Sequence, residues 1–299
     1  MSENLKIPTN NYISVLANFA IFAILILYFN IGNDDKLVQI VVTLILAEPH
    51  FFLTIPLLIL YKELFKENKV TFVYIPIIML FILVLFFFKF KNIFYIIFLL
   101  ANLFHVNRQS QGVAKLALKE NSTKFANYLW IYYIFFSFVF ISPHLFLILK
   151  SNFYYKIIVS LFAFVSFIFV TKYLKKKLTI KEYCLTFSGL LIFWPSLFFD
   201  NILYAMGAGI SMHYMQYLLL AGKIISKQYH QSKVIWIVIS LFFYTLFSTL
   251  ALSGSITINK DSAFILIPTI IQIYHFYYDS FIWKMSNPTI RKKIISSFG

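Results

Sequence analysis

Cysteine is nearly absent from this sequence, and its histidines follow no familiar box pattern. Cys184 is the only cysteine, which excludes a disulfide framework and any zinc or iron–sulfur site built from several thiolates. A bound metal would therefore need histidine, carboxylate or amide ligands. The chain also contains no His-x-x-x-His and no His-x-x-His-His pattern, so the histidine boxes of the well-known membrane desaturases and hydroxylases are missing.

Charged residues are scarce as well, at 12% of the chain, whereas hydrophobic residues make up 61%. A soluble domain carries about 25% charged residues. With so little polar surface available, much of the exterior is expected to face lipid. The net charge of +15 would suggest nucleic acid in a soluble protein, but membrane proteins concentrate Lys and Arg in their cytoplasmic loops. No nucleic-acid partner is predicted.

Long apolar runs follow one another along almost the whole chain. They predict an all-α, polytopic transmembrane helical bundle of about ten spans, because a bilayer crossing takes about 20 residues. The whole of 1–299 is expected to form one integral membrane domain, with a short cytoplasmic N-terminal segment at 1–11 and a basic cytoplasmic tail at 286–299. Only the Asp200–Asn201 turn separates the seventh and eighth runs, so a re-entrant hairpin is the alternative there. The predicted spans are 12–30, 37–61, 70–88, 92–107, 125–149, 154–171, 182–199, 202–224, 234–252 and 262–284.

The loops provide an independent test of this count. With both termini inside, the inner segments hold twenty of the 26 Lys and Arg residues, and the outer segments hold six. Cytoplasmic loops of membrane proteins carry such an excess, and removing one span would scramble it. The charge pattern therefore favours ten spans and an orientation with both ends inside.

Four of the six histidines fall inside predicted spans, where an ionisable residue is costly and marks a functional candidate. His50, His105, His213 and His275 all lie on spans that run from outside to inside, 13, 13, 11 and 13 residues from the outer end. At 1.5 Å per residue this is a common depth of roughly 17–20 Å. We therefore predict these four histidines as metal ligands.

Polar residues accompany the histidines at short spacings and complete the candidate site. Glu48 precedes His50, Arg108 and Gln109 follow His105 by three and four residues, and Asp279 follows His275 by four. A carboxylate at that spacing suits a second ligand or a group that orients the imidazole. Fe(II) is the predicted metal, with zinc, copper or haem as alternatives. Taken singly, each histidine could instead hydrogen-bond a neighbouring helix.

Three segments carry a resemblance to known proteins. They are Pro49-His50-Phe51-Phe52, the His105-x-x-Arg108-Gln109-x-x-Gly112 motif, and the run from Tyr274 to Lys284. They resemble segments of uncharacterised bacterial multi-span proteins and, more distantly, of the Brp/Blh family of membrane-bound β-carotene dioxygenases. That resemblance implies iron bound by histidines and cleavage of a carotenoid. The chain departs from the family pattern in having Phe51-Phe52 after His50, and in having a single histidine, His213, in place of a pair.

These features lead to two main functional hypotheses. The first is a non-haem iron oxygenase or dioxygenase of the bacterial inner membrane that acts on an apolar lipid or carotenoid-like molecule. In it, Glu48 or Asp279 serves as a ligand or base, and Arg108 and Gln109 hold a polar end of the substrate. The second is a proton- or metal-ion-coupled transporter that uses the same residues. A membrane scaffold is a third alternative.

Overall fold

The structure of the protein is a computed structural model. It describes residues 46–62, 68–117, 123–145, 153–174, 178–198, 202–258 and 266–284, together with positions 66, 287, 290, 292, 294, 296 and 297. Within these ranges the regular elements are all helical and no strand occurs, which confirms the all-α prediction. The predicted N-terminal segment 1–11, the predicted first span 12–30 and the start of the span 37–61 lie outside the described residues.

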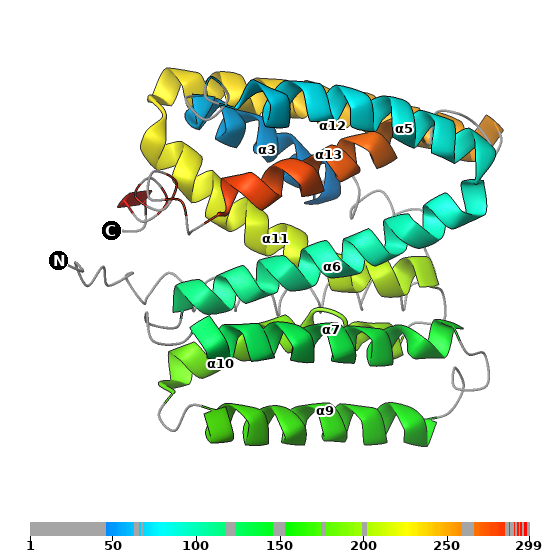
Figure 1. Cartoon of the computed structure of the whole chain (residues 1–299), viewed down its shortest axis with the longest axis vertical. Coiled ribbons are helices and arrows are strands. Elements are labelled where there is room, and N and C mark those ends of the chain that lie inside the picture. Colours follow the sequence, from blue (N-terminus) through cyan, green and yellow to red (C-terminus); the bar gives the residue numbers. More distant parts are fainter. Residues whose placement is uncertain are drawn as a thin grey trace. The chain divides into compact units, whose positions relative to one another are not determined.

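The described helices group into two compact units, which divide near residues 100 and 216. The first unit contains α3 (Glu48–Leu60), η2 (Val70–Tyr74), α5 (Ile75–Lys89), α12 (Gln231–Ile258) and α13 (Leu266–Ile282). Figure 1 shows these helices in blue, cyan, yellow and orange. In this unit α3 packs against both α12 and α13, and α13 also packs against α5. Two long helices, α6 (Lys91–Ala117) and α11 (Ile202–Gln228), continue from one unit into the other, and the prediction of a single domain stays a prediction.

A proline in the first unit explains how α13 is held in place. Pro76 has no N–H, so neither the Phe72 carbonyl four residues earlier nor the Thr71 carbonyl five residues earlier receives its usual helical bond from that position. Both carbonyls instead accept hydrogen bonds from α13, from Tyr278 at 3.2 Å and Tyr277 at 2.6 Å. Pro76 thus leaves two backbone acceptors in η2 that bind α13. The two tyrosines that donate to them lie between His275 and Asp279 in the sequence.

The second unit contains α7 (Thr123–Leu145), α9 (Phe153–Leu174), α10 (Ile180–Leu191) and η4 (Trp194–Leu197). Helix α9 packs against α7 in the opposite direction, since the Tyr132 hydroxyl meets Ser166 Oγ at 2.7 Å while Ser142 Oγ meets the Tyr155 hydroxyl at 2.7 Å. Helix α10 begins with a capping box: the Thr179 hydroxyl accepts from the Glu182 amide at 3.3 Å, and the Glu182 carboxylate accepts from the Thr179 amide at 2.9 Å.

The predicted seventh span, 182–199, is not one continuous α-helix. Helix α10 ends at Leu191 and a short 3-10 helix begins at Trp194. Pro195 gives the reason, because it cannot donate to the Leu191 carbonyl and it disfavours helical geometry at the residue before it. A 12-residue helix is about 18 Å long and falls short of a hydrocarbon core of about 30 Å.

By length and apolarity alone, two helices among the described residues qualify as membrane-spanning. They are Val70–Lys89, which combines η2 and α5, and Phe153–Tyr173 in α9. Three further apolar helices are shorter, namely Glu48–Leu60, Thr186–Leu197 and Gln231–Phe247. The structure therefore bears out an all-helical chain with apolar segments able to cross a membrane, and the number ten stays a prediction.

One glycine allows two helices of the second unit to approach each other. A Cβ built on Gly189 would lie 2.6 Å from Cζ of Tyr133, whose ring is fully buried. We expect Gly189→Ala to destabilise the fold by about 1–3 kcal/mol, because the ring has no free space to move into. Thermal unfolding of the detergent-solubilised protein measures this. Gly112→Ala is the matched control, since nothing lies within 4 Å of its Cβ; an equal loss in both variants would contradict the packing explanation.

Candidate metal centre

The polar core of the first unit is built from two packed helices with the same local design. On α3, Thr54 follows His50 by four residues, and on α13, Asp279 follows His275 by four. This spacing puts the two side chains of each helix on one face. All four side chains are buried, with exposed fractions of 4% or less. The contact between α3 and α13 thus brings two imidazoles, a hydroxyl and a carboxylate together in an otherwise apolar interior.

The distances within this group are those of direct contacts. Nε2 of His50 lies 2.8 Å from Nε2 of His275, and the two rings are 4.3 Å apart between centroids. The second oxygen of Asp279, Oδ2, lies 3.4 Å from the same His275 nitrogen. Nε2 of His275 is therefore in contact with both a second imidazole and a carboxylate oxygen, and the two imidazoles lie 225 residues apart in the chain.

A chain of hydrogen bonds determines which nitrogen of His275 carries its proton. The Tyr217 hydroxyl on α11 donates to Oδ1 of Asp279 at 2.9 Å. The same hydroxyl lies 3.2 Å from Oγ1 of Thr54, which in turn lies 2.5 Å from Nδ1 of His275. With Asp279 ionised, Tyr217 donates to it and accepts from Thr54, and Thr54 then accepts from Nδ1–H of His275. This assignment leaves Nε2 of His275 without a hydrogen, as a metal ligand requires.

The two contacts of His275 Nε2 have lengths close to those between ligands of one metal. Ligand atoms about 2.0–2.1 Å from a metal lie roughly 2.9–3.4 Å from one another at angles between right-angled and tetrahedral. The His275–Asp279 separation of 3.4 Å falls at the upper end of that range, and the His50–His275 separation of 2.8 Å lies just below its lower end. Without a metal, the His50 nitrogen would carry a hydrogen and donate it to His275. With a metal, that hydrogen would move to Nδ1 of His50.

The other predicted residue of α3, Glu48, lies elsewhere on the helix. It is buried in the first turn of α3. Residues two apart do not face each other on a helix, so Glu48 does not share the face of His50 and Thr54. A negative charge in the first turn is favoured by the helix dipole. Asp279, by contrast, places Oδ2 3.4 Å from Nε2 of His275.

The predicted residues of α6 belong to the second unit. Arg108 is exposed, donates to the Gln111 side chain, and lies 5.5 Å from the centroid of the Trp130 ring. Both amide atoms of Gln109 are buried, and among the described residues they have no hydrogen-bond partner. An amide placed in this way can hold a polar group of a ligand. Burial and the Arg108 charge lower the pKa of Lys115 further along this helix.

His105 and His213 form a second pair within the second unit. Their rings meet edge to face at 5.4 Å between centroids, with His105 on α6 and His213 on α11. Gln216 lies one turn after His213 and is 3% exposed. Within the first unit His50 contacts His275, and within the second unit His105 contacts His213. That all four bind one metal stays a prediction.

The two histidines outside the predicted set make ordinary contacts. Nε2 of His144, near the end of α7, lies 2.9 Å from the Ser196 carbonyl of η4. Nδ1 of His230, just before α12, lies 3.0 Å from the Ser232 hydroxyl. Each is linked to the neighbouring backbone or loop, which makes them suitable controls for experiments on metal binding.

Sequence reasoning missed two members of the group, Thr54 and Tyr217. Thr54 had a usable signal, because it follows His50 at the same four-residue spacing that singled out Asp279. Tyr217 had none, since it is one of 20 tyrosines. The tyrosines of α13 drew attention instead, but Tyr274, Tyr277 and Tyr278 donate to the backbone of η2 and α5.

Comparison with known proteins adds no assignment, because no family model, curated protein or solved structure matches this chain. Any function must therefore be inferred from the chemistry of these residues.

Proposed function

We propose that the chain is a polytopic integral membrane protein of about ten spans, with N- and C-termini inside. Support comes from the distribution of its side chains, which combines buried polar groups with a broadly apolar exterior. The interior of the described part contains His50, Asp279, Asn107 and Gln111, each 4% exposed or less. Large apolar residues point outward instead, such as Phe81 on α5 at 65%. Soluble monomers rarely expose broad apolar surfaces, whereas lipid-facing helices must.

Helix directions within each unit support the same proposal. In the second unit, α7 and α9 run in opposite directions, as neighbouring fifth and sixth spans would. The contacts of α7 with the segment formed by α10 and η4 advance in the same direction along both segments. The Tyr133 hydroxyl donates to the Thr186 carbonyl, and, further along both segments, His144 bonds the Ser196 carbonyl. The fifth and seventh predicted spans should indeed run in the same direction. In the first unit, the tyrosines of α13 pair with η2 and α5 in reverse order, as the tenth and third spans would.

Within this membrane protein, we infer a metal site formed by His50, His275 and Asp279. The observation that carries the proposal is the contact of His275 Nε2 with both His50 Nε2 and Asp279 Oδ2, in a buried group where Thr54 contacts the other ring nitrogen of His275. Two histidines and one carboxylate, with the remaining positions open, are typical of non-haem iron oxygenases. Iron(II) is therefore the proposed metal. When bound, it would supply the redox chemistry for oxidising an apolar molecule.

The chain's own residues would perform three tasks in such an enzyme. Asp279 would serve as a ligand through Oδ2 while its other oxygen accepts from Tyr217, which keeps the carboxylate oriented. Thr54 would hold the proton on Nδ1 of His275. The Phe51 ring, 5.3 Å from the His275 ring, gives the site an apolar border. An apolar lipid or carotenoid-like substrate fits such surroundings better than a sugar or a nucleotide does.

A second candidate function has one specific observation in its favour. Asp279, Tyr217, Thr54, His275 and His50 are linked in a continuous series of short polar contacts. A series of this kind can relay protons, as ionisable residues do in membrane pumps and transporters. A proton-coupled transporter would need these groups for transport without needing a bound metal, so metal content separates the two candidates.

The test is the metal content of the purified wild-type protein. We expect about one iron per chain after extraction from membranes in mild detergent under anaerobic conditions, with little zinc, copper or haem, because the open two-histidine, one-carboxylate set suits iron. Elemental analysis and the haem absorption spectrum measure this. Helical content checked by circular dichroism shows that the sample is folded. A folded protein that binds none of these metals, even when Fe(II) is added, would overturn the enzyme proposal and favour the transporter.

A further inference from the structure

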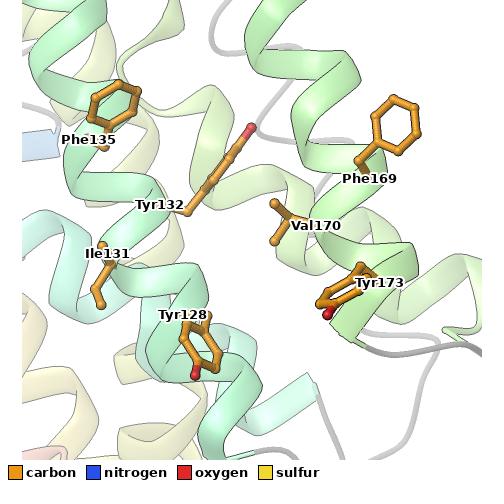
Figure 2. A pocket seen from close by; sticks show the side chains of 7 residues that line it. All are labelled: Tyr128, Ile131, Tyr132, Phe135, Phe169, Val170 and Tyr173. Carbon is orange, nitrogen blue, oxygen red and sulfur yellow. The ribbon is translucent and has the colours of Figure 1, made fainter.

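An open groove runs between α7 and α9 in the second unit. Its volume is about 620 Å³, and five aromatic and two aliphatic residues line it. Figure 2 shows Tyr128 of α7 and Tyr173 of α9 at one end, with Phe135 and Phe169 toward the other. The volume lies within the range of about 300–1,000 Å³ that is usual for ligand pockets.

The wall of the groove is apolar although it contains tyrosines. The Tyr132 hydroxyl is directed to the backbone and side chain of α9, since it donates to the Ala163 carbonyl at 2.6 Å and lies 2.7 Å from Ser166 Oγ. Its ring is therefore what the groove presents, together with Ile131 and Val170. A long apolar chain would bury well along such a surface.

Lys172 of α9 is exposed beside Tyr173 at one end of the groove. The sequence that precedes α7 and follows α9 is rich in further lysines. In sequence these are Lys115, Lys119 and Lys124 before or at the start of α7, and Lys175, Lys176, Lys177 and Lys181 after α9. Lys172 and Tyr173 are both exposed. Basic clusters next to the inner end of membrane helices attract anionic lipid headgroups.

We propose that this groove is a binding site for an anionic phospholipid of the inner leaflet. One acyl chain lies along Ile131, Tyr132 and Val170. The phosphate lies at the basic end, where Lys172 supplies charge and the hydroxyls of Tyr128 and Tyr173 are at interface depth. Charge complementarity selects this occupant over a neutral lipid. The inference rests on the proposed membrane placement and not on the metal site.

Native mass spectrometry of the full-length protein in detergent tests this, with titrations of phosphatidylglycerol and phosphatidylcholine of the same chain length. We expect phosphatidylglycerol to bind the wild type more tightly. Lys172→Gln should reduce that preference by roughly fivefold, the effect of about one lysine at a membrane surface. Lys156→Gln, at the opposite end of α9, should leave it unchanged.

Substitutions that fill the groove test whether an acyl chain binds in it. Val170→Trp should weaken the binding of both lipids by on the order of tenfold, because it removes the space for the acyl chain. Val165→Trp is the matched control, since Val165 is exposed on the same helix and does not line the groove. Ile131→Trp repeats the test from the α7 wall. Equal binding of the two lipids to the wild type, or equal effects of Val170→Trp and Val165→Trp, would overturn the proposal.

Extraction of membranes with alkaline carbonate tests the membrane placement independently of the lipid site. A protein that stays in the washed membranes but shows no lipid preference contradicts the groove site alone. A protein that carbonate releases contradicts the membrane placement itself, and with it the lipid site.

Discussion

We expect His50→Ala and His275→Ala each to be purified without metal, whereas the wild type retains it. Each substitution removes one of the two imidazoles whose Nε2 atoms lie 2.8 Å apart. Two remaining protein ligands would not hold a divalent ion against its hydration in a site built for three. Asp279→Asn should have the same direction of effect, because a neutral amide binds iron more weakly than a carboxylate does. Elemental analysis of the purified variants measures the loss.

Histidines elsewhere in the chain provide the controls for this experiment. His144→Ala and His230→Ala should retain the wild-type metal content, since their side chains contact Ser196 and Ser232. Metal that survives both His50→Ala and His275→Ala in folded protein would refute the proposed ligand set. His105→Ala and His213→Ala decide the wider hypothesis, because metal loss in these variants too would extend the set to all four histidines.

The second large effect is expected from residues that do not touch the metal. Thr54→Val and Tyr217→Phe should each weaken metal binding by about 10- to 100-fold, the usual cost of removing a group that orients a ligand. Thr54→Val removes the acceptor that holds the proton on Nδ1 of His275, and Tyr217→Phe removes the donor to Asp279. Competition with a chelator of known iron affinity measures the change.

Three further variants distinguish orientation from general damage. Thr54→Ser keeps the hydroxyl and should restore most of the affinity. Thr171→Val replaces a buried threonine whose hydroxyl donates to carbonyls of its own helix, α9, and Tyr277→Phe removes a tertiary bond of α13 to Thr71. Both should leave metal affinity near that of the wild type. An equal loss in Tyr217→Phe and Tyr277→Phe would show that the effect is structural.

Helix positions were largely predictable from the chain itself. The runs 70–88, 154–171 and 234–252 coincide with helical segments at Val70–Lys89, Phe153–Leu174 and Gln231–Ile258. Apolar runs locate helices well because a chain in an apolar environment must satisfy its own backbone groups. The run 182–199 is not one continuous helix, because a count of apolar residues gives no weight to the hydrogen bond that Pro195 cannot make.

The candidate site was only partly predictable, and its histidines show why. Counting residues at a fixed rise per residue gives the depth of a side chain in a helix, and depth singled out His50, His105, His213 and His275. Depth does not say which helices are neighbours or toward which of them a side chain points. The pairing of His50 with His275 depends on the contact between α3 and α13, which lie more than 200 residues apart in the chain.

The sequence by itself determined the class of this protein, an all-helical chain with apolar segments and low charge. It also placed ionisable residues inside apolar segments, and its single cysteine excluded a metal site built from several thiolates. These properties follow from composition and from the period of the helix, which are local. Only the tertiary structure decided that His50 contacts His275, that Asp279 contacts the same His275 nitrogen, and that Thr54 and Tyr217 join this group. Hydrogen bonds between helices set these roles, and their geometry depends on packing that no single segment encodes. The near-absence of cysteine leaves the imidazoles of His50 and His275 and the carboxylate of Asp279 as the ligands we propose.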